Sequence, residues 1–390
     1  MSDAPPPDAS LQGRDSFVRA SFGDTRPPPG RVGGPVRWLR DNLFSSPLNT
    51  ALTLLLLYVL ATTLPDFLRF TLIDAIWEGE DRDACRAQTL GREPGACWAF
   101  VKARTAYFMY GQYPFEERWR VDLTWLLGGL GVVWMLWPSA PRKTAGAVFF
   151  FILFPLLAFV LLTGFSAVGL PAVPTYLWGG LLVTLVISAI GIVVSLPLGV
   201  LLALGRRSRL PAVKFMSVVF IEFVRGVPLI TVLFMANVML PLFLPDGWRP
   251  DSLVRVLIGV ALFAAAYMAE VVRGGLQAIP KGQYEGAMSL GLGYWRTMTL
   301  IILPQALKVV IPGIVNTFIG LFKDTSLVSI VGIFDLMRTV EASLTDPKWA
   351  TPVTRFSGYF FAALVYFVFC FGMSRYSMWM ERRLATDHRN

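Results

Sequence analysis

Long apolar runs separated by shorter polar segments set the hydrophobic pattern of this chain. A helix needs about 20 residues to cross the hydrocarbon core of a bilayer, and only the second run falls clearly short of that length. The pattern predicts an all-α, polytopic transmembrane helical bundle of about eight spans. In order, the runs are residues 48–67, 123–137, 145–170, 177–204, 215–244, 253–276, 306–330 and 356–378.

The composition excludes a soluble globular protein. Of the 390 residues, 55% are hydrophobic and 16% are charged, and the mean hydropathy is +0.57. Soluble domains carry about 25% charged residues. We therefore expect a multi-pass protein of the bacterial inner membrane.

The net charge of +9 lies on alternate loops rather than on one basic surface. Cytoplasmic loops of membrane proteins carry an excess of Lys and Arg. This asymmetry argues against nucleic-acid binding and predicts that both termini and the loop between the sixth and seventh runs are cytoplasmic. The basic residues on this side are Arg142, Lys143, Arg206, Arg207, Arg209, Lys214, Arg273, Lys281, Arg296, Arg375, Arg382, Arg383 and Arg389, against Arg249, Arg255, Arg338, Lys348 and Arg355 on the other.

Polar segments flank the spans at both ends. Residues 1–46, rich in Pro, Gly, Asp and Arg up to about Pro35, are expected to form a disordered cytoplasmic tail. No apolar core or small-residue cleavage site of a signal peptide lies near the start. Arg37 and Arg40 would hold the N-terminus inside or contact anionic lipid, and residues 381–390 form a second cytoplasmic tail.

A long polar segment, residues 68–122, follows the first span and is expected in the periplasm. It contains Cys85 and Cys97, which are expected to form a disulfide in an oxidising compartment; two free thiols are the alternative. Cys370, inside the last run, is expected to be a small apolar residue. Metal binding is not expected, because the only histidine is His388 in the tail.

The runs fall into two groups. Residues 171–380 hold five spans with mostly short connections and look like a complete core. Residues 47–170 hold three additional spans and the long outer loop, and look like an N-terminal addition. A single inseparable bundle is the alternative.

A loop with its own apolar stripe, residues 279–304, joins the sixth and seventh runs. Residues 283–290 and 294–302 predict two short helices, and Gly291 and Gly293 allow a sharp turn between them. An apolar face on the aqueous side of a membrane protein indicates a docking surface; an ordinary amphipathic surface loop is the alternative. The stripe consists of Ala287, Leu290, Leu292, Trp295 and Ile302.

Charged side chains inside the spans are candidates for gating or a substrate path, because they are costly in hydrocarbon unless they face a cavity or a partner. In the fifth run, Glu222 and Arg225 are spaced to pair on one helix face, and Pro228 predicts a kink.

The sixth run carries a similar group. Tyr267 and Glu270 share one helix face, with Arg273 about one turn further toward the cytoplasm. A Glu270–Arg273 salt bridge that fixes the helix and a role in gating are both open.

Polar residues also interrupt the seventh run. A bent or broken helix there would direct donors and acceptors into a cavity, which two residues of the fifth run could complete. The candidates for this substrate path are Asn316, Thr317, Lys323, Asp324, Thr325 and Ser326, with Met235 and Asn237.

Catalytic motifs are missing from the sequence. It contains no GxxxxGK[ST] phosphate loop, no HExxH and no paired-cysteine motif. We therefore expect no enzyme activity and no cofactor in this chain, so that ATP and Mg would be bound by a partner.

The spacing within the loop resembles the EAA loop of ATP-binding-cassette (ABC) importer permeases. That pattern is Glu-Ala-Ala, a Gly four residues beyond the second Ala, and Ile-x-Leu-Pro ten residues beyond that Gly. The departure here is Gly for the first Ala. The matching residues are Glu285, Gly286, Ala287, Gly291, Ile301, Leu303 and Pro304.

Four further segments resemble, in the same order, the polar amino-acid subfamily of these permeases: EFVRGVPL, AYMAEVVRGG, ILPQALK and NTFIGLFKDTSLVSIVG. The N-terminal WLRDNLFSSPLNT looks like the larger permease of the general L-amino-acid importer and its glutamate/glutamine/aspartate relatives. The resemblance implies a type I ABC importer permease core, a dimer of ATPase subunits, a second and related permease, and a periplasmic amino-acid-binding protein.

One departure bears on the substrate. Many relatives that carry basic amino acids have Glu where this chain has Thr317. Strict selectivity for a cationic side chain is therefore not expected, and broad or glutamate/glutamine/aspartate specificity fits better. Asp324 could bind an α-ammonium group, pair with Lys323 or cap a helix.

Two other functions remain as alternatives. An ion-coupled secondary transporter would act without an ATPase, and a membrane scaffold would not transport at all. A scaffold would leave Glu270, Lys323 and Asp324 without a role inside the spans.

Overall fold

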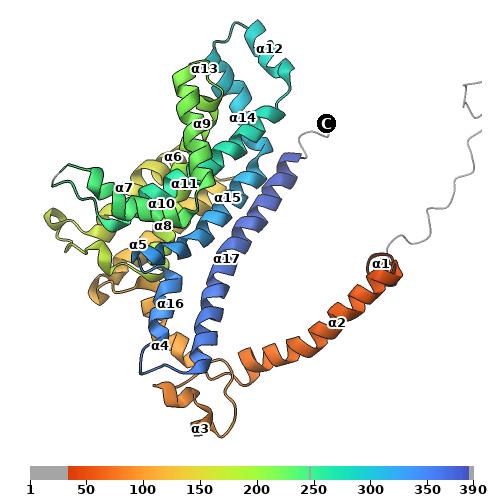
Figure 1. The fold of residues 1–390 in the computed structure, drawn as a ribbon, viewed down its shortest axis with the longest axis vertical. Coiled ribbons are helices and arrows are strands. Elements are labelled where there is room, and N and C mark those ends of the chain that lie inside the picture. Colours follow the sequence, from red (N-terminus) through yellow and green to blue (C-terminus); the bar gives the residue numbers. More distant parts are fainter. Residues whose placement is uncertain (1–33, 246, 386–390) are drawn as a thin grey trace, which may run out of the picture. The chain divides into compact units, whose positions relative to one another are not determined.

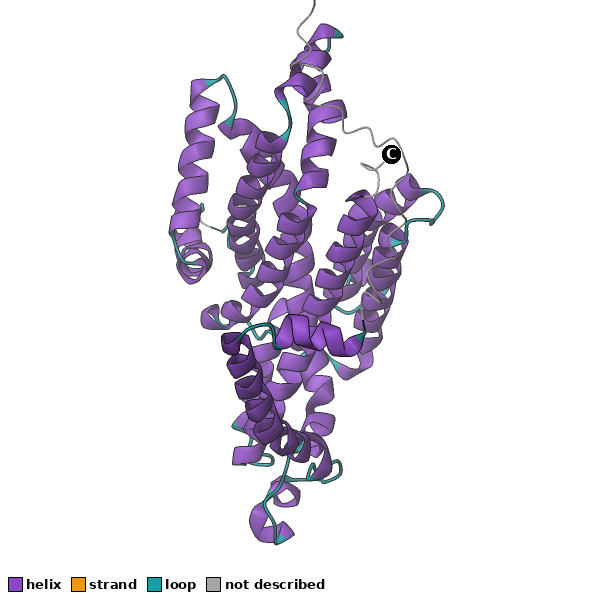
Figure 2. Ribbon diagram, turned by 90° about the vertical axis from the view of Figure 1, so that its right-hand side faces the viewer, coloured by secondary structure: helices purple, strands orange, loops and turns teal. Residues whose placement is uncertain are grey.

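A computed structural model describes residues 34–245 and 247–385, and Figure 2 shows that helices dominate them. The chain divides into two compact units between Leu68 and Arg69. The described residues contain three isolated β-bridges and no β-strand. The all-α prediction is confirmed.

The first unit contains helices α1 (Pro35–Leu43) and α2 (Pro47–Leu68) (Figure 1). A proline at the start and Arg40 in the last turn both favour α1. The prediction of a disordered tail over residues 1–46 is therefore wrong for Pro35–Leu43, and residues 1–33 lie outside the described residues. No residue of α2 is buried, as expected of a helix that faces lipid.

Six helical stretches of the described residues are long and apolar enough to cross a membrane, and there are up to seven if one strongly bent pair counts as a span. These six to seven stretches are close to the predicted number of about eight spans. The stretches are Pro47–Ile73, Lys143–Thr163, Gly180–Arg206, Ser252–Ala278, Ile311–Val331 and Pro352–Leu384, with Pro211–Gly226 and Leu229–Phe243 as the bent pair.

The predicted second span accounts for the difference. It is a helix, α5 (Arg118–Leu136), but three charged residues lie in its first turns. One of them, Arg120, is completely buried, pairs with Glu117 at 2.5 Å and donates a hydrogen bond to the carbonyl of Pro171 at 2.9 Å. This start is a polar anchor, which leaves α5 with a shorter apolar stretch than the six helical stretches named above.

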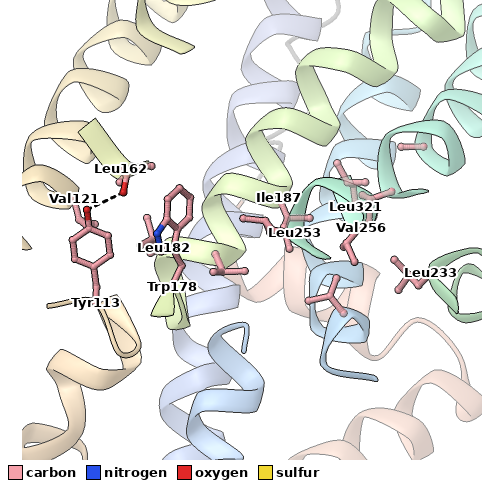
Figure 3. Close-up of a cluster of buried hydrophobic side chains, with 14 of the residues drawn as sticks. Tyr113, Val121, Leu162, Trp178, Leu182, Ile187, Leu233, Leu253, Val256 and Leu321 are labelled. Atoms are coloured by element: carbon pink, nitrogen blue, oxygen red, sulfur yellow. Dashed lines mark hydrogen bonds between the residues drawn. The ribbon is translucent and has the colours of Figure 1, made fainter. Parts of the chain in front are cut away.

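Helices α8 (Gly180–Arg206) and α11 (Ser252–Ala278) form the most extensively packed pair of the second unit. A Cβ atom on Gly199 would lie 2.6 Å from the Cβ of Met268, so the absence of a side chain there lets the two helices approach closely. Figure 3 shows the buried cluster at one end of this pair, which includes Leu182, Ile187, Leu253, Val256 and Leu321.

The remaining elements of the second unit differ widely in length, and the longest of them is α17. Those with α-helical geometry carry the label α, and the 3-10 and π segments carry the label η. They are η2 (Arg69–Ile73), η3 (Arg82–Cys85), α3 (Ala87–Leu90), α4 (Trp98–Tyr110), η4 (Phe115–Glu117), α6 (Lys143–Val148), η5 (Phe149–Leu153), α7 (Phe154–Thr163), η6 (Ser166–Val168), η7 (Thr175–Leu177), α9 (Pro211–Gly226), α10 (Leu229–Phe234), η8 (Met235–Met239), η9 (Leu240–Phe243), α12 (Lys281–Ser289), α13 (Tyr294–Arg296), η10 (Thr297–Ile302), α14 (Leu303–Val309), α15 (Ile311–Asp324), η11 (Thr325–Val331), α16 (Leu336–Leu344) and α17 (Pro352–Ala385).

The predicted kink near Pro228 is confirmed and is larger than a kink. The helical pair Pro211–Gly226 and Leu229–Phe243 bends by 111°. Proline lacks the N–H needed to continue the helix ladder and restricts the residue before it, so α9 ends at Gly226. A single continuous helix over residues 215–244 is therefore wrong.

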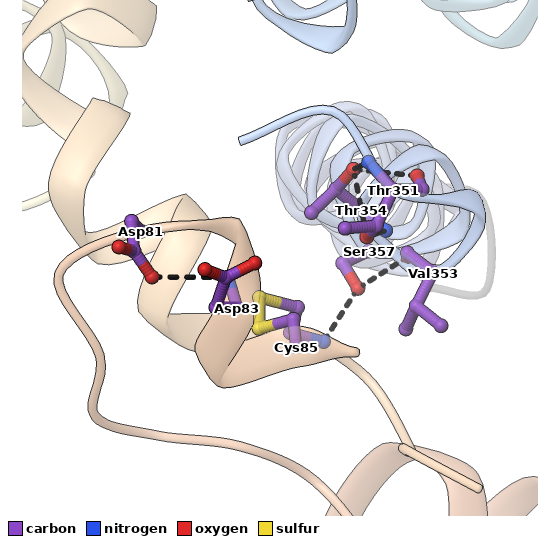
Figure 4. Close-up of a disulfide and its surroundings, with 8 residues drawn as sticks. Asp81, Asp83, Cys85, Thr351, Val353, Thr354 and Ser357 are labelled. Carbon is purple, nitrogen blue, oxygen red and sulfur yellow. Dashed lines mark hydrogen bonds between the residues drawn. A yellow bond between two sulfur atoms is a disulfide. The ribbon is translucent and has the colours of Figure 1, made fainter. Parts of the chain in front are cut away.

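The predicted polar loop 68–122 is largely folded. We call residues 74–110, which contain η3, α3 and α4, the disulfide cap. Cys85 and Cys97 are bonded within it, with their Cα atoms 5.9 Å apart, which confirms the predicted pairing. Figure 4 shows this disulfide beside the start of α17, where the backbone N–H of Cys97 donates to the hydroxyl of Ser357 at 2.7 Å.

The disulfide cap packs on the hairpin of α16 and α17. Phe100 and Trp349 are buried against each other in a shared apolar cluster, with ring centroids 6.0 Å apart. Arg104 pairs with Asp346 across the same contact. The predicted division of the chain at residue 170 remains a prediction, and within the second unit this part of the expected addition is in close contact with the core.

Removing the disulfide should destabilise the cap. The two cysteines are 12 residues apart in sequence, and closing a loop of this size stabilises a fold by about 3 kcal/mol in the chain-entropy account. We expect Cys85→Ala/Cys97→Ala to lower the unfolding temperature of the purified protein in a thermal denaturation assay. Cys370→Ala, which removes a half-buried free thiol, is the control, and an equal shift in both variants would contradict a stabilising bond.

The predicted C-terminal tail, residues 381–390, is described only in part. Helix α17 continues to Ala385, so residues 381–385 of the predicted C-terminal tail are helical. Residues 386–390, including His388, lie outside the described residues.

Candidate functional site

A capped helical turn forms the predicted loop 279–304. Helix α12 ends at Ser289, and Gly291 follows with a φ of +72°, a conformation that L side chains rarely adopt. The N–H of Leu292 donates to the carbonyl of Ala287 at 3.3 Å and that of Gly291 to Met288 at 2.9 Å, which satisfies the last carbonyls of α12. The predicted helix–turn–helix is confirmed.

The predicted apolar stripe does not form one face. Ala287 and Ile302 are buried, whereas Leu290 and Trp295 are exposed. The reason is the backbone: the turn at Gly291 and the π-helical segment η10 rotate the second half of the loop relative to the first.

The exposed apolar side chains gather instead around the turn. We call this group the loop tip; it consists of Met288, Leu290, Tyr294 and Trp295, each at least half exposed. Glu285 is also exposed, and a Cβ on Gly286 would meet nothing within 4 Å. The other motif residues differ: Ile301 and Leu303 pack against the buried cluster around Ile302, and Pro304 is exposed.

Figure 1 shows the loop tip at one end of the second unit, where α12 and α13 extend beyond the other helices. The disulfide cap with α3 lies at the opposite end. Met298 and Ile302 anchor the loop in a buried cluster with Leu204 of α8 and Leu276 of α11. The loop is therefore fixed to the core on one side and exposed on the other.

A network of ion pairs joins α8, α9 and α11. Glu270 of α11 lies 2.9 Å from Arg206 of α8, 2.8 Å from Arg273 of its own helix and 3.7 Å from Arg225 of α9. The Glu270–Arg273 salt bridge, one of the two alternatives, is present, and a role in gating stays open. The predicted pairing of Glu222 with Arg225 is wrong, because Glu222 pairs with Arg206 at 2.8 Å.

Tyr267 lies beside this network. The guanidinium of Arg225 sits 5.6 Å from the centroid of its ring, a distance typical of a cation–π contact. Tyr267 is 39% exposed, whereas only 16% of the Glu270 side chain is exposed. Three arginine side chains thus surround one largely shielded carboxylate.

The seventh run is broken as predicted. Helices α14 and α15 meet at Val310, and the geometry changes from α to 3-10 at Thr325. Lys323 is exposed, and Asp324 is half-buried without capping η11 through its side chain.

Most hydroxyls of this segment bond to their own helix. Thr317 donates to Gly313 at 2.9 Å, Thr325 to Phe322 at 2.8 Å and Ser326 to Lys323 at 2.9 Å, in each case to the carbonyl. Asn316 is exposed, on α15 next to Thr317.

Asn237 was expected to lie with the polar residues of the seventh run, but its hydrogen bonds go elsewhere. It accepts a hydrogen bond from Ser252 at 2.8 Å and donates to the carbonyl of Val331 at 3.4 Å, while its own carbonyl accepts from Arg255. These contacts link η8 to the start of α11 and the end of η11. Among the described residues no hydrogen bond links Asn237 to Thr317 or Asp324. The grouping of these residues with Asn237 and the partly exposed Met235 in one substrate path therefore remains a prediction.

Asp335 was not among the predicted site residues; it precedes α16 and is completely buried. Its carboxylate accepts hydrogen bonds from the N–H groups of Met337 at 3.0 Å and Arg338 at 3.1 Å and from the hydroxyl of Tyr366 at 3.2 Å. Burial raises the pKa of Asp335 from its ordinary value of 3.8 to about 6, although these hydrogen bonds oppose the shift. An Asp followed by an apolar helix is an N-cap signal that could have located it.

This buried carboxylate should make stability depend on pH. Because the pKa of Asp335 is higher in the fold than in the unfolded chain, the stability of the protein falls as the pH rises from about 4 to above 6, by up to about 3 kcal/mol. Asp335→Asn keeps an N-cap acceptor and should remove this dependence. Unfolding of both proteins from about pH 4 to pH 7.5 tests it; the same slope in both would contradict the assignment.

Within residues 34–245 and 247–385, no three His, Cys, Asp or Glu side chains are grouped so that they could hold a metal ion.

Comparison with known proteins identifies the chain. Residues 195–386 match the family described as binding-protein-dependent transport system inner membrane component. The inner membrane amino-acid ABC transporter permease protein YhdY of Escherichia coli is 51% identical over 349 residues, which cover 90% of this chain and 93% of that relative. The chain belongs to the amino-acid ABC transporter permeases.

Two other relatives of this permease differ in length. The glutamate/glutamine/aspartate/asparagine transport system permease protein BztC of Rhodobacter capsulatus is 43% identical over 437 residues, covering 96% of this chain and 99% of that relative. The glutamate/aspartate import permease protein GltK of Escherichia coli is 34% identical over 220 residues, covering 55% of this chain and 96% of that relative.

This permease is therefore a multi-pass inner-membrane transport protein and not a secondary transporter acting alone. Its family implies ATPase and binding-protein partners.

Proposed function

We propose that this permease imports L-amino acids of the glutamate, glutamine and aspartate type, or a broader set that includes them. The name of the relative BztC supports this substrate class. Thr317 supports it too, because a neutral hydroxyl at that position supplies no countercharge for a cationic substrate. In this proposal a periplasmic binding protein delivers the amino acid, and a dimer of ATPase subunits drives transport.

The observation that carries the coupling part of the proposal is the loop tip. It presents four exposed apolar side chains on a rigid capped turn that is anchored in the core. Exposed apolar groups on a fixed element are typical of a protein docking surface. The ATPase subunits bind here, with Glu285 beside the contact, and they hold the ATP and Mg that this chain does not bind.

Two features support the orientation in the membrane that we propose. The loop tip and the disulfide cap lie at opposite ends of the second unit (Figure 1). Disulfides persist in the periplasm and are rare in the cytoplasm, so the cap faces the periplasm and the loop tip the cytoplasm. Both termini are cytoplasmic in this arrangement, in agreement with the basic residues of the loops.

A second permease subunit completes the pathway, and we propose that it is related rather than identical. The relative GltK is matched almost completely by 55% of this chain, which supports the division into a core and an N-terminal addition of three helical segments. Asp324 lies at the end of α15 with part of its side chain exposed, and we propose that it contacts the substrate ammonium group together with Asn316 and Ser326.

Copurification with the products of neighbouring genes, followed by reconstitution in vesicles, tests this function. Labelled glutamate should enter only with ATP and binding protein present, and unlabelled aspartate and glutamine should compete better than arginine. Leucine competition measures the breadth of the substrate set. Uptake that collapses with an uncoupler while ATP is maintained would contradict the proposal.

A further inference from the structure

Two consecutive arginines at the end of α8 reach in different directions. Arg207 donates hydrogen bonds to the carbonyl of Leu276 and to the hydroxyl of Tyr284, both at 3.2 Å. Its guanidinium also lies 5.7 Å from the centroid of the Tyr284 ring. Because Tyr284 belongs to α12 and Leu276 to α11, Arg207 joins the ends of three helices.

Tyr284 completes this contact. Its hydroxyl donates to the carbonyl of Leu276 at 3.1 Å while it accepts from Arg207. Three groups thus form a closed triangle of hydrogen bonds, which restrains both side chains more than one bond would.

Arg206, the preceding residue, is part of the ion-pair network. It binds Glu222 of α9 and Glu270 of α11, and Glu270 in turn binds Arg225 and Arg273. The end of α8 therefore contacts the loop 279–304 through Arg207 and the charged residues of α9 and α11 through Arg206.

The helix turn just before these two arginines has little freedom to absorb a movement. Ala203 and Leu204 are buried in the cluster that α8 shares with α11. A Cβ on Gly205 would lie 2.3 Å from the hydroxyl of Ser217, so α8 and α9 are already in close contact there. A displacement of Tyr284 is thus passed to Arg206 rather than lost in a flexible turn.

We propose that Arg207 and Tyr284 are positioning residues that transmit the movement of the cytoplasmic loop to the Glu270 network and so link ATP hydrolysis to transport. This inference rests on the proposed docking of ATPase subunits at the loop tip. The loop also has anchors besides these two residues, because Met298 and Ile302 are buried in the cluster against which Tyr284 packs.

The experiment measures labelled glutamate taken up per ATP hydrolysed by the reconstituted importer. We expect Tyr284→Ala and Arg207→Ala each to lower this ratio about five- to tenfold, at the lower end of couplings between distant sites, with basal ATP hydrolysis retained. Tyr284→Phe keeps the ring and should lose less. The double variant should be no worse than either single variant, because both remove the same contact.

Arg209→Ala is the matched control. It removes an exposed arginine two residues further along the same loop and should leave the ratio unchanged. Wild-type ratios in both single variants, additive effects in the double variant, or loss of the ATPase subunits on purification would overturn the relay. A wild-type importer that moves glutamate without hydrolysing ATP would overturn the proposed function as well.

Discussion

Replacing Gly291 by valine is expected to abolish ATP-driven uptake while the protein still reaches the membrane. Gly291 has a φ of +72°, a region that a β-branched residue adopts only with strain of about 1–3 kcal/mol. Nothing lies within 4 Å of the position of its Cβ, so the cost comes from the backbone and not from a clash. The turn should open and misplace the loop tip.

Gly286→Ala is the matched control for this change. Gly286 is helical, its Cβ position is equally empty, and alanine stabilises an exposed helix by up to about 1 kcal/mol relative to glycine. We expect normal or slightly higher uptake. The measurement is uptake and substrate-stimulated ATP hydrolysis by the purified importer, normalised to the amount of permease. Full coupling in Gly291→Val would remove the loop from the mechanism.

The second large effect is expected at Glu270. Glu270→Gln removes the negative charge that three arginines share in a largely shielded site. Uncompensated charge of this kind destabilises a protein by about 3–5 kcal/mol. We expect a marked fall in the unfolding temperature and in the amount of permease in the membrane.

Glu222→Gln provides the comparison, because Glu222 is 54% exposed and pairs only with Arg206. An exposed ion pair contributes about 0–1 kcal/mol. The two variants also distinguish a structural role of Glu270 from a role in gating. If Glu270→Gln is stable but transports poorly, the network acts in gating; if it unfolds at a lower temperature, the network holds the helices together. Equal behaviour of both variants would contradict the central position of Glu270.

The sequence located the loop well because its signals are local. A helix, a glycine at positive φ and a second helix depend on residues a few positions apart, and the turn at Gly291 formed as predicted. Which side chains of the loop are buried was not predictable in the same way. Burial of Ala287 and Ile302 depends on the end of α11 and on the π-helical segment η10, and neither leaves a periodic signal.

The partner of each charged residue was also not predictable from the sequence. Glu222 and Arg225 have the spacing of a helical pair, but Arg206, 16 residues before Glu222, lies close enough to take its place. The sequence could identify which charged residues lie inside the spans, since each is costly in lipid. It could not rank their partners, because that choice depends on how α8, α9 and α11 pack.

Helix α4 was overlooked because charged segments on both sides made residues 68–122 resemble a loop. Its buried residues, including Phe100 and Phe108, face α16 and α17, which come more than 200 residues later in the sequence. A helix that depends on partners so distant along the chain has little local pattern of its own.

The hydrogen bond from Cys97 to Ser357 joins residues 260 positions apart. At roughly 5–20 residues per second, a ribosome needs on the order of 10–50 s to extend the chain over that distance. In the proposed orientation the two cysteines are outside the membrane and can be oxidised throughout that interval, whereas the start of α17, on which their segment rests, has not been synthesised. In that orientation we therefore expect the disulfide to form first and the packing against α17 to be completed only after the last helix is inserted.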